Sequence, residues 1–255
     1  MAGYEGAFAR YYDSLTADVD YRGRGRYLKE LVEKHGGRLR LVLDLACGTG
    51  SLALELARQG AEVIAVDGSQ EMLAQAMSKS AGVTPPVLYL CQGMEELDLY
   101  GTVDTTLCVL DSLNHLPGKD AIREVFRRVH LFTEPGGLFL FDMNTPEKHR
   151  SRLDGSTFVR ETEEVCCIWQ NTLEPEGEDN GITIDLDFFV WEGEDRYRRY
   201  SESFREVAFP QGEIAALLEE TGFRLLEVQG DYTGAPPVPG EERILYIARR
   251  ISQNG

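Results

Sequence analysis

Four aspartates each follow a short apolar run, and together they could form one ligand site. They are Asp44, Asp67, Asp111 and Asp142. Carboxylates can hold the hydroxyl groups or the positive charge of a polar ligand. A single aspartate in such a position is commonly a helix cap or a turn residue. Four of them after successive predicted strands favour a shared site.

The segment DLACGTG, from Asp44 to Gly50, is the second chemical signal. Small residues at positions 46, 48 and 50 let the backbone approach a ligand closely, and the predicted helix after them offers free N–H groups to an anion. A nicotinamide site would read GxGxxG, whereas position 51 is Ser, so the dinucleotide fingerprint is missing. No Lys follows the glycines, which excludes a P-loop.

These residues need elements that bring them to one place. Apolar runs at 41–45, 62–66, 87–91, 103–110 and 138–144 alternate with helical patterns, and a helix and two strands follow at about 212–250. Alternation of this kind predicts an α/β fold with a mostly parallel sheet and helices on both faces. The carboxyl ends of parallel strands lie on one edge of the sheet, where the ligands of such folds bind.

The pattern changes after about residue 150. Residues 157–173 and 181–193 are typical of two antiparallel strands joined by the acidic turn at 174–181, and a third strand is predicted from residue 196. We therefore expect one domain made of residues 1–150 and 208–255, with a β-rich insertion or lid at 151–207. The exposed strands of this insertion could pair across a homodimer.

Several motifs, in order and at the right intervals, make residues 40–145 similar to the class I S-adenosylmethionine-dependent methyltransferases. LDLACGTG resembles the first motif of that family, VIAVDGSQEML (63–73) the second, LDSLNHL (110–116) the motif beside the methyl-donor sulfur, and PGGLFLFDMN (135–144) the fifth strand. The resemblance implies a seven-stranded sheet whose last strand is antiparallel. It also implies S-adenosyl-L-methionine as cofactor.

The resemblance assigns roles to residues of this sequence. Asp67 would bind the ribose hydroxyls and Met72 would lie beside the adenine. Gly93 stands where the family commonly has an acidic residue near the adenine amine, so the backbone of Met94 is the expected substitute. The cofactor-binding residues implied are Asp44, Ala46, Gly48, Gly50, Asp67, Gly68, Met72, Gly93, Met94, Leu110 and Asp111.

The activity implied is in-line transfer of a methyl group to a small or medium polar acceptor, beneath a roof made by the insertion and the N-terminal segment. A general base is needed only if the acceptor arrives protonated. The candidates for catalysis are Tyr12, His115 and Asp142, and those for acceptor binding are Tyr12, Tyr21, Asn114 and Asn144. Each has a structural alternative, such as a helix contact or a turn cap. His149 is expected to face solvent.

Composition limits the partners. The 255 residues include 26 Lys and Arg against 43 Asp and Glu, a formal net charge of −17. This charge argues against nucleic acid and against anionic membranes. Five cysteines without a CxxC pair, scattered histidines without a zinc signature, and no secretory or membrane-spanning segment favour a cytoplasmic protein without a bound metal. Two alternatives remain open: a non-catalytic module that binds S-adenosylmethionine, and a nicotinamide-dependent oxidoreductase.

Overall fold

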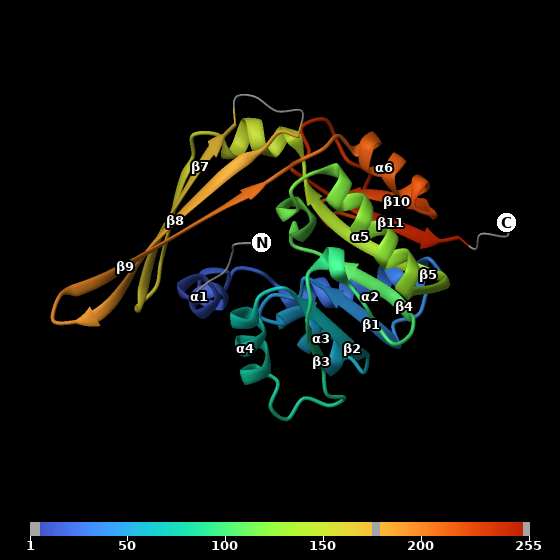
Figure 1. Ribbon diagram of the computed structural model, residues 1–255, viewed down its shortest axis with the longest axis horizontal. Coiled ribbons are helices and arrows are strands. Elements are labelled where there is room, and N and C mark those ends of the chain that lie inside the picture. Colours follow the sequence, from blue (N-terminus) through green and yellow to red (C-terminus); the bar gives the residue numbers. More distant parts are fainter. Residues whose placement is uncertain (1–5, 175–178, 252–255) are drawn as a thin grey trace.

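The computed structural model describes residues 6–174 and 179–251, and it contains two β-sheets (Figure 1). Sheet A has seven strands in the order β10-β11-β5-β4-β1-β2-β3, and β11 runs antiparallel to both of its neighbours. Its strands are β1 (Leu41–Leu45), β2 (Glu62–Asp67), β3 (Leu88–Cys91), β4 (Val103–Cys108), β5 (Thr133–Asn144), β10 (Phe223–Gly230) and β11 (Arg243–Arg250). The predicted α/β fold with a mostly parallel sheet is confirmed.

The central strands are apolar on both faces because helices cover both. In β1, Val42 packs into one core with α2 (Tyr21–Lys34) and α3 (Ser51–Arg58), whereas Leu43 packs into the other core with α5 (Lys119–Phe132) and α6 (Gln211–Glu220). This two-sided burial is what a parallel strand requires. The remaining helical segments are α1 (Ala7–Leu15), α4 (Gln70–Lys79), the 3₁₀ turns η1 (Met94–Glu96) and η2 (Ser112–His115), and the π-helical η3 (Lys148–Leu153).

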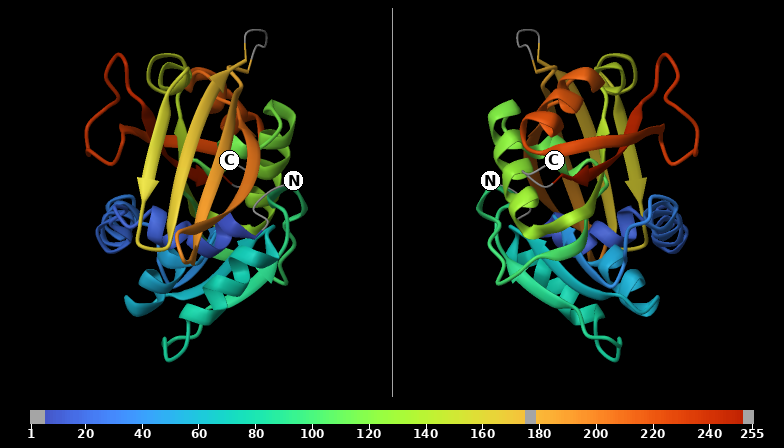
Figure 2. Two further views of the ribbon diagram at one scale, coloured as in Figure 1. Left: turned by 90° about the vertical axis from the view of Figure 1, so that its left-hand side faces the viewer. Right: turned by 90° about the vertical axis from the view of Figure 1, so that its right-hand side faces the viewer.

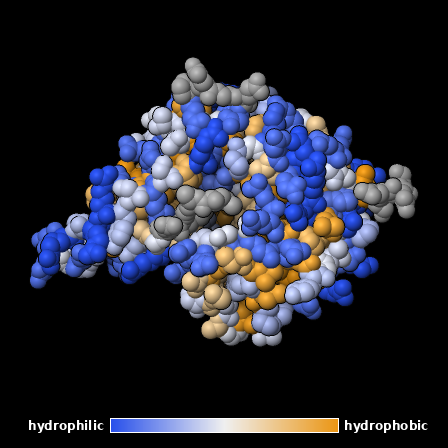
Figure 3. Space-filling model, in the orientation of Figure 1, coloured by the Kyte–Doolittle hydropathy of each residue, from blue (hydrophilic) through white to orange (hydrophobic). Residues whose placement is uncertain are grey.

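Sheet B is antiparallel, in the order β6-β7-β8-β9, and lies between β5 and α6 in the chain. Its strands are β6 (Thr157–Glu161), β7 (Val165–Leu173), β8 (Ile182–Gly193) and β9 (Arg196–Glu206). They lie side by side (Figure 2) and extend away from sheet A as an arm (Figure 1). The end of the arm is largely hydrophilic in the view of Figure 3.

One detail of the predicted insertion is wrong: residues 157–173 form two strands instead of one. The chain turns between them, where the Thr162 hydroxyl accepts hydrogen bonds from the N–H groups of Glu164 and Val165. The third predicted strand is present as β9. The predicted turn at 174–181 falls partly outside the described residues. The division into two domains stays a prediction.

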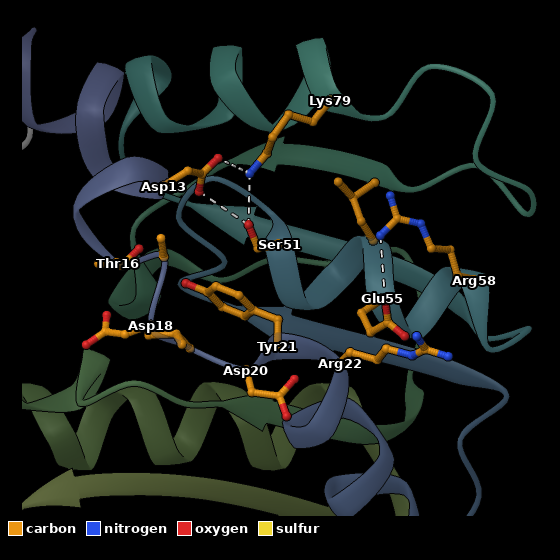
Figure 4. A pocket seen from close by; sticks show the side chains of 13 residues that line it. Asp13, Thr16, Asp18, Asp20, Tyr21, Arg22, Ser51, Glu55, Arg58 and Lys79 are labelled. Atoms are coloured by element: carbon orange, nitrogen blue, oxygen red, sulfur yellow. Dashed lines mark hydrogen bonds and ion pairs between the residues drawn. The ribbon is translucent and has the colours of Figure 1, made fainter. Parts of the chain in front are cut away.

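Helix α1 connects the two sheets. Phe8 and Tyr11 join a third core with Ile184 and Phe188 of sheet B, and the Phe8 N–H donates to Glu202 of β9. At its other end, Asp13 accepts a hydrogen bond from Thr49. It also accepts one from Ser51 and pairs with Lys79 of α4, at 2.5 Å from carboxylate oxygen to Nζ (Figure 4). None of the helices within the described residues is long and apolar enough to span a membrane.

Candidate active site

A cavity of about 1010 Å³ opens at the carboxyl edge of sheet A and continues beneath sheet B. We call the part lined by the loops after β1, β2 and β3 the sheet A side, and the part lined by sheet B the sheet B side. The predicted site residues among its lining are Tyr12, Tyr21, Asp44, Ala46, Gly48, Asp67, Gly68, Met72, Met94, Leu110, Asp111, His115 and Asn144. Gly50, Gly93, Asn114 and Asp142 are outside that set.

The turn after β1 carries three residues with positive φ: Ala46 at 59°, Gly48 at 54° and Gly50 at 72°. A side chain on Gly48 would meet no atom within 4 Å, so this glycine presents open backbone to the cavity. A Cβ on Gly50 would lie 2.9 Å from the Cβ of Ala76, so this glycine permits close packing of α3 against α4. The two glycines therefore have different roles. Gly50 allows two helices to pack closely, and of the two only Gly48 faces the cavity.

Two carboxylates end the first two strands. The carboxylate of Asp67 accepts hydrogen bonds of 2.8 Å from the N–H groups of Gly48 and Ser69, one on each oxygen. Burial raises the pKa of Asp44 to about 7, and the nearby charge of Asp67 adds to the rise. Oδ2 of Asp44 is buried without a hydrogen-bond partner in the structure. An unsatisfied buried oxygen at the wall of a cavity is suited to a donor or a cation of a ligand.

The segment after β3 has Gly93 in extended backbone (φ −66°, ψ 152°), followed by the short helix η1. Met94, which is buried, and Glu95 line the cavity, whereas Gly93 does not. Of the two residues expected near the adenine after this strand, Met94 is therefore the one in position to contact a ligand.

The carboxylate of Asp142 fixes the turn after β4 by accepting hydrogen bonds from its backbone. Leu110 and Asp111 adopt φ values of 60° and 54°, which are uncommon for residues other than glycine. Both of their N–H groups donate to Asp142, at 3.0 and 2.7 Å. The same carboxylate accepts from Tyr232 at 2.5 Å and from Arg243 at 2.8 Å. Asp142 is fully buried, so its contacts are structural, and it does not reach the cavity.

Asn114 and Asn144 join the two sheets. The side chain of Asn114 accepts from the N–H of Asn144 and donates to the carbonyls of Asn144 and Val207, the residue after β9. The side chain of Asn144 donates to Asp111 at 2.7 Å and to Glu206 at 3.1 Å. Asn114 is completely buried. It anchors sheet B to sheet A, whereas Asn144 also lines the cavity.

Glu206 is a cavity residue that the sequence analysis missed. It ends β9 with 4% of its surface exposed, and its carboxylate lies 3.8 Å from Nε2 of His115 and 3.6 Å from Nε2 of His149. The expectation that His149 faces solvent is wrong, because its side chain is fully buried. The strand predicted from residue 196 was the available sign, and it does not single out Glu206, because most residues of β9 are exposed.

A family model described as a methyltransferase domain matches residues 42–137. The chain is 34% identical over 249 residues to the Bacillus subtilis (strain 168) protein named "Putative methyltransferase YqeM", and the match covers 97% of both chains. A solved structure of an S-adenosylmethionine-dependent methyltransferase from Clostridium acetobutylicum ATCC 824 has 30% identity and a TM-score of 0.86, covering 96% of this chain and 98% of that one.

The chain belongs to the class I S-adenosylmethionine-dependent methyltransferases. A further relative of this methyltransferase is the glycine/sarcosine N-methyltransferase of Parasynechococcus marenigrum (strain WH8102), at 28% identity over 84% of this chain and 74% of that one.

The sheet A side of this methyltransferase fits its cofactor. The cofactor has a positive centre, an amino-acid tail and a pair of hydroxyls. The side chain of Asp44 has an oxygen without a hydrogen-bond partner, which suits the first, and the open backbone at Gly48 suits the second. The carboxylate of Asp67 suits the hydroxyls. Within residues 6–174 and 179–251, no group of three or more His, Cys, Asp or Glu side chains is arranged to hold a metal ion.

Proposed function

We propose that this methyltransferase transfers the methyl group to a small or medium polar molecule bound on the sheet B side of the cavity. The single observation that carries the proposal is the continuity of the cavity from Asp67, at the end of β2, to Glu206, at the end of β9. S-adenosylmethionine would supply a methyl group bound to a sulfonium. The acceptor attacks the methyl carbon in line with the sulfur, and S-adenosylhomocysteine leaves, once the two are aligned in a site without water.

On the sheet A side, we assign the ribose hydroxyls to Asp67, whose oxygens keep lone pairs beyond the two backbone bonds that fix them. The turn at Ala46–Gly48 would hold the amino-acid tail, and Asp44 would face its positive charge. Met72 and Met94, both buried at the cavity wall, would pack on the adenine. These side chains would position the cofactor.

On the sheet B side, Ile184, Leu186 and Phe204 form an apolar wall that would keep water from the acceptor. Tyr12 and Tyr21 line the cavity from the N-terminal segment, and His115 and Asn144 line it from the edge of sheet A. We propose these four side chains as acceptor contacts. The glycine/sarcosine N-methyltransferase relative, whose name gives small molecules as acceptors, supports an acceptor of this size.

Calorimetric titration tests the cofactor, and labelled methyl transfer tests the acceptor. We expect S-adenosylhomocysteine to bind and NADH not to bind. With isotopically labelled S-adenosylmethionine, a panel of small amines, hydroxy acids and phenols should include acceptors that gain the label. Binding without transfer to any compound of the panel or to a protein-free cell extract would favour the non-catalytic alternative. Label in protein or RNA alone would overturn the small-molecule proposal.

A further inference from the structure

The meeting point of the two sheets contains a buried acid, Glu206, whose surroundings are unusual. Oε2 of this carboxylate accepts a hydrogen bond of 3.1 Å from the Asn144 amide and lies 3.6 Å from His149 Nε2. Oε1 lies on the side of His115, at 3.8 Å from Nε2. The residue is 4% exposed, and it borders the cavity. A carboxylate removed from water in this way is stabilised by a compensating positive charge or by taking up a proton.

His149 does not supply that charge in its neutral form. Nδ1 of His149 lies 2.8 Å from the carbonyl oxygen of Asn180, and because a carbonyl only accepts, Nδ1 carries a hydrogen. Nε2 of the same ring is fully buried and has no hydrogen-bond partner. A neutral ring therefore turns a lone pair toward Glu206. One proton between Glu206 and His149, or one cation from elsewhere, would compensate the charge of this buried carboxylate.

The permanent cations nearby are already engaged. Arg243 bridges Asp111 and Asp142, at 2.9 and 2.8 Å, and Lys148 lies on the side-chain oxygen of Asn144 with its charge acting on Asp111. Arg205, the neighbour of Glu206 in β9, points to Glu174 and Asp179. Among the described residues, Glu206 forms ion pairs with His115 and His149 and with no Lys or Arg.

We infer that the missing charge is the acceptor's: the molecule methylated is an amine, and its nitrogen binds to Glu206 as an ammonium group. The inference rests on the proposed function, and it adds the class of acceptor and a catalytic residue. The aromatic side chains Phe8, Phe158, Trp169 and Phe204 also line the cavity, so an amine with an apolar or aromatic body would fill the space beside Glu206.

Glu206 then has a chemical task. An ammonium nitrogen has no lone pair and cannot accept a methyl group. Transfer of one proton to the Glu206 carboxylate breaks an N–H bond, forms an O–H bond and leaves both electrons of the N–H bond on nitrogen as the nucleophilic pair. Asn144, itself fixed by Asp111, donates to the carboxylate and holds it in place during this transfer.

Matched pairs of amine and alcohol test the inference without knowledge of the natural acceptor. The probes are benzylamine with benzyl alcohol, 2-phenylethylamine with 2-phenylethanol, and cyclohexylamine with cyclohexanol. Binding of each is measured by NMR titration of the protein saturated with S-adenosylhomocysteine. We expect at least one amine to bind about tenfold or more tightly than its alcohol, and Glu206→Gln to remove this preference. Glu242→Gln, at an exposed position of the cavity lining, is the matched control and should keep it.

The outcomes separate this inference from the proposed function. Unchanged binding of S-adenosylhomocysteine to Glu206→Gln shows that the variant is folded and that the sheet A side is intact. If every alcohol binds as tightly as its amine, or if the preference survives in Glu206→Gln, the inference is overturned while the proposed function stands. Failure of the wild-type protein to bind S-adenosylhomocysteine would instead overturn the proposed function.

Discussion

The two sides of the cavity are built in different ways. On the sheet A side, the residues follow consecutive strands within short stretches of chain: 44–48 after β1, 67–72 after β2 and 94–95 after β3. On the sheet B side, His115, Asn144 and Glu206 come from three distant segments that Asn114 and Asn144 join. A ligand bound by backbone turns requires a fixed local sequence pattern. A ligand bound by side chains can be contacted by residues from distant parts of the chain.

Asp142 lies beneath both sides, and its removal should have the largest effect. Asp142→Ala would leave the N–H groups of Leu110 and Asp111, the Tyr232 hydroxyl and the Arg243 guanidinium without their acceptor. We expect the free energy of unfolding in urea to fall by about 3–5 kcal/mol, as when one partner of a buried ion pair is lost. Tyr232→Phe, which removes one of these bonds, should lower it by about 1 kcal/mol. Equal losses in both variants would contradict a central role of Asp142.

A change confined to the sheet A side should weaken cofactor binding alone. Asp67→Ala removes the proposed ribose contacts and the acceptor of the Gly48 N–H. We expect the binding free energy of S-adenosylhomocysteine to weaken by about 1.5–3 kcal/mol in calorimetry, the range for hydrogen bonds to a charged group. Glu62→Ala, at the opposite end of β2, is the control and should bind normally. Unchanged affinity in Asp67→Ala would remove this residue from the site.

Proton binding at Asp44 should sharpen the contrast further. Because burial raises the pKa of Asp44 to about 7, this carboxyl is mostly neutral at pH 6 and mostly charged at pH 8. If the charged form pairs with a positive group of the cofactor, the affinity for S-adenosylmethionine should fall about tenfold from pH 8 to pH 6. Asp44→Asn should flatten this pH dependence in the same titration. A wild-type affinity independent of pH would contradict the assignment.

Sequence patterns could place the sheet A residues at one edge of the sheet because the signals are local, and their roles toward the cofactor stay predictions. Gly48 and Asp67 follow buried strands whose apolar runs are visible in the sequence, and strand–helix alternation brings their ends to one edge. The same patterns could not show that Asp142 and Asn114 turn inward, since that depends on Arg243, Tyr232 and Val207 far along the chain.

Glu206 was missed, and the expected exposure of His149 was wrong, for a related reason. Each is a polar residue in an ordinary polar context, and its burial results only from the way sheet B packs against the end of β5. The turn at 162–164 was missed because its Thr-Glu-Glu sequence lacks the Gly, Pro, Asn or Asp that commonly signals a hairpin.

The contact between Arg243 and Asp142 also has a consequence for folding during translation. These residues are 101 positions apart. Ribosomes add about 5 to 20 residues per second, so Asp142 exists for about 5 to 20 s before its partner has been translated. During that interval the centre of sheet A lacks its neighbour β11 and has an uncovered strand edge. β5 therefore stays an edge strand of sheet A until β11 has been translated.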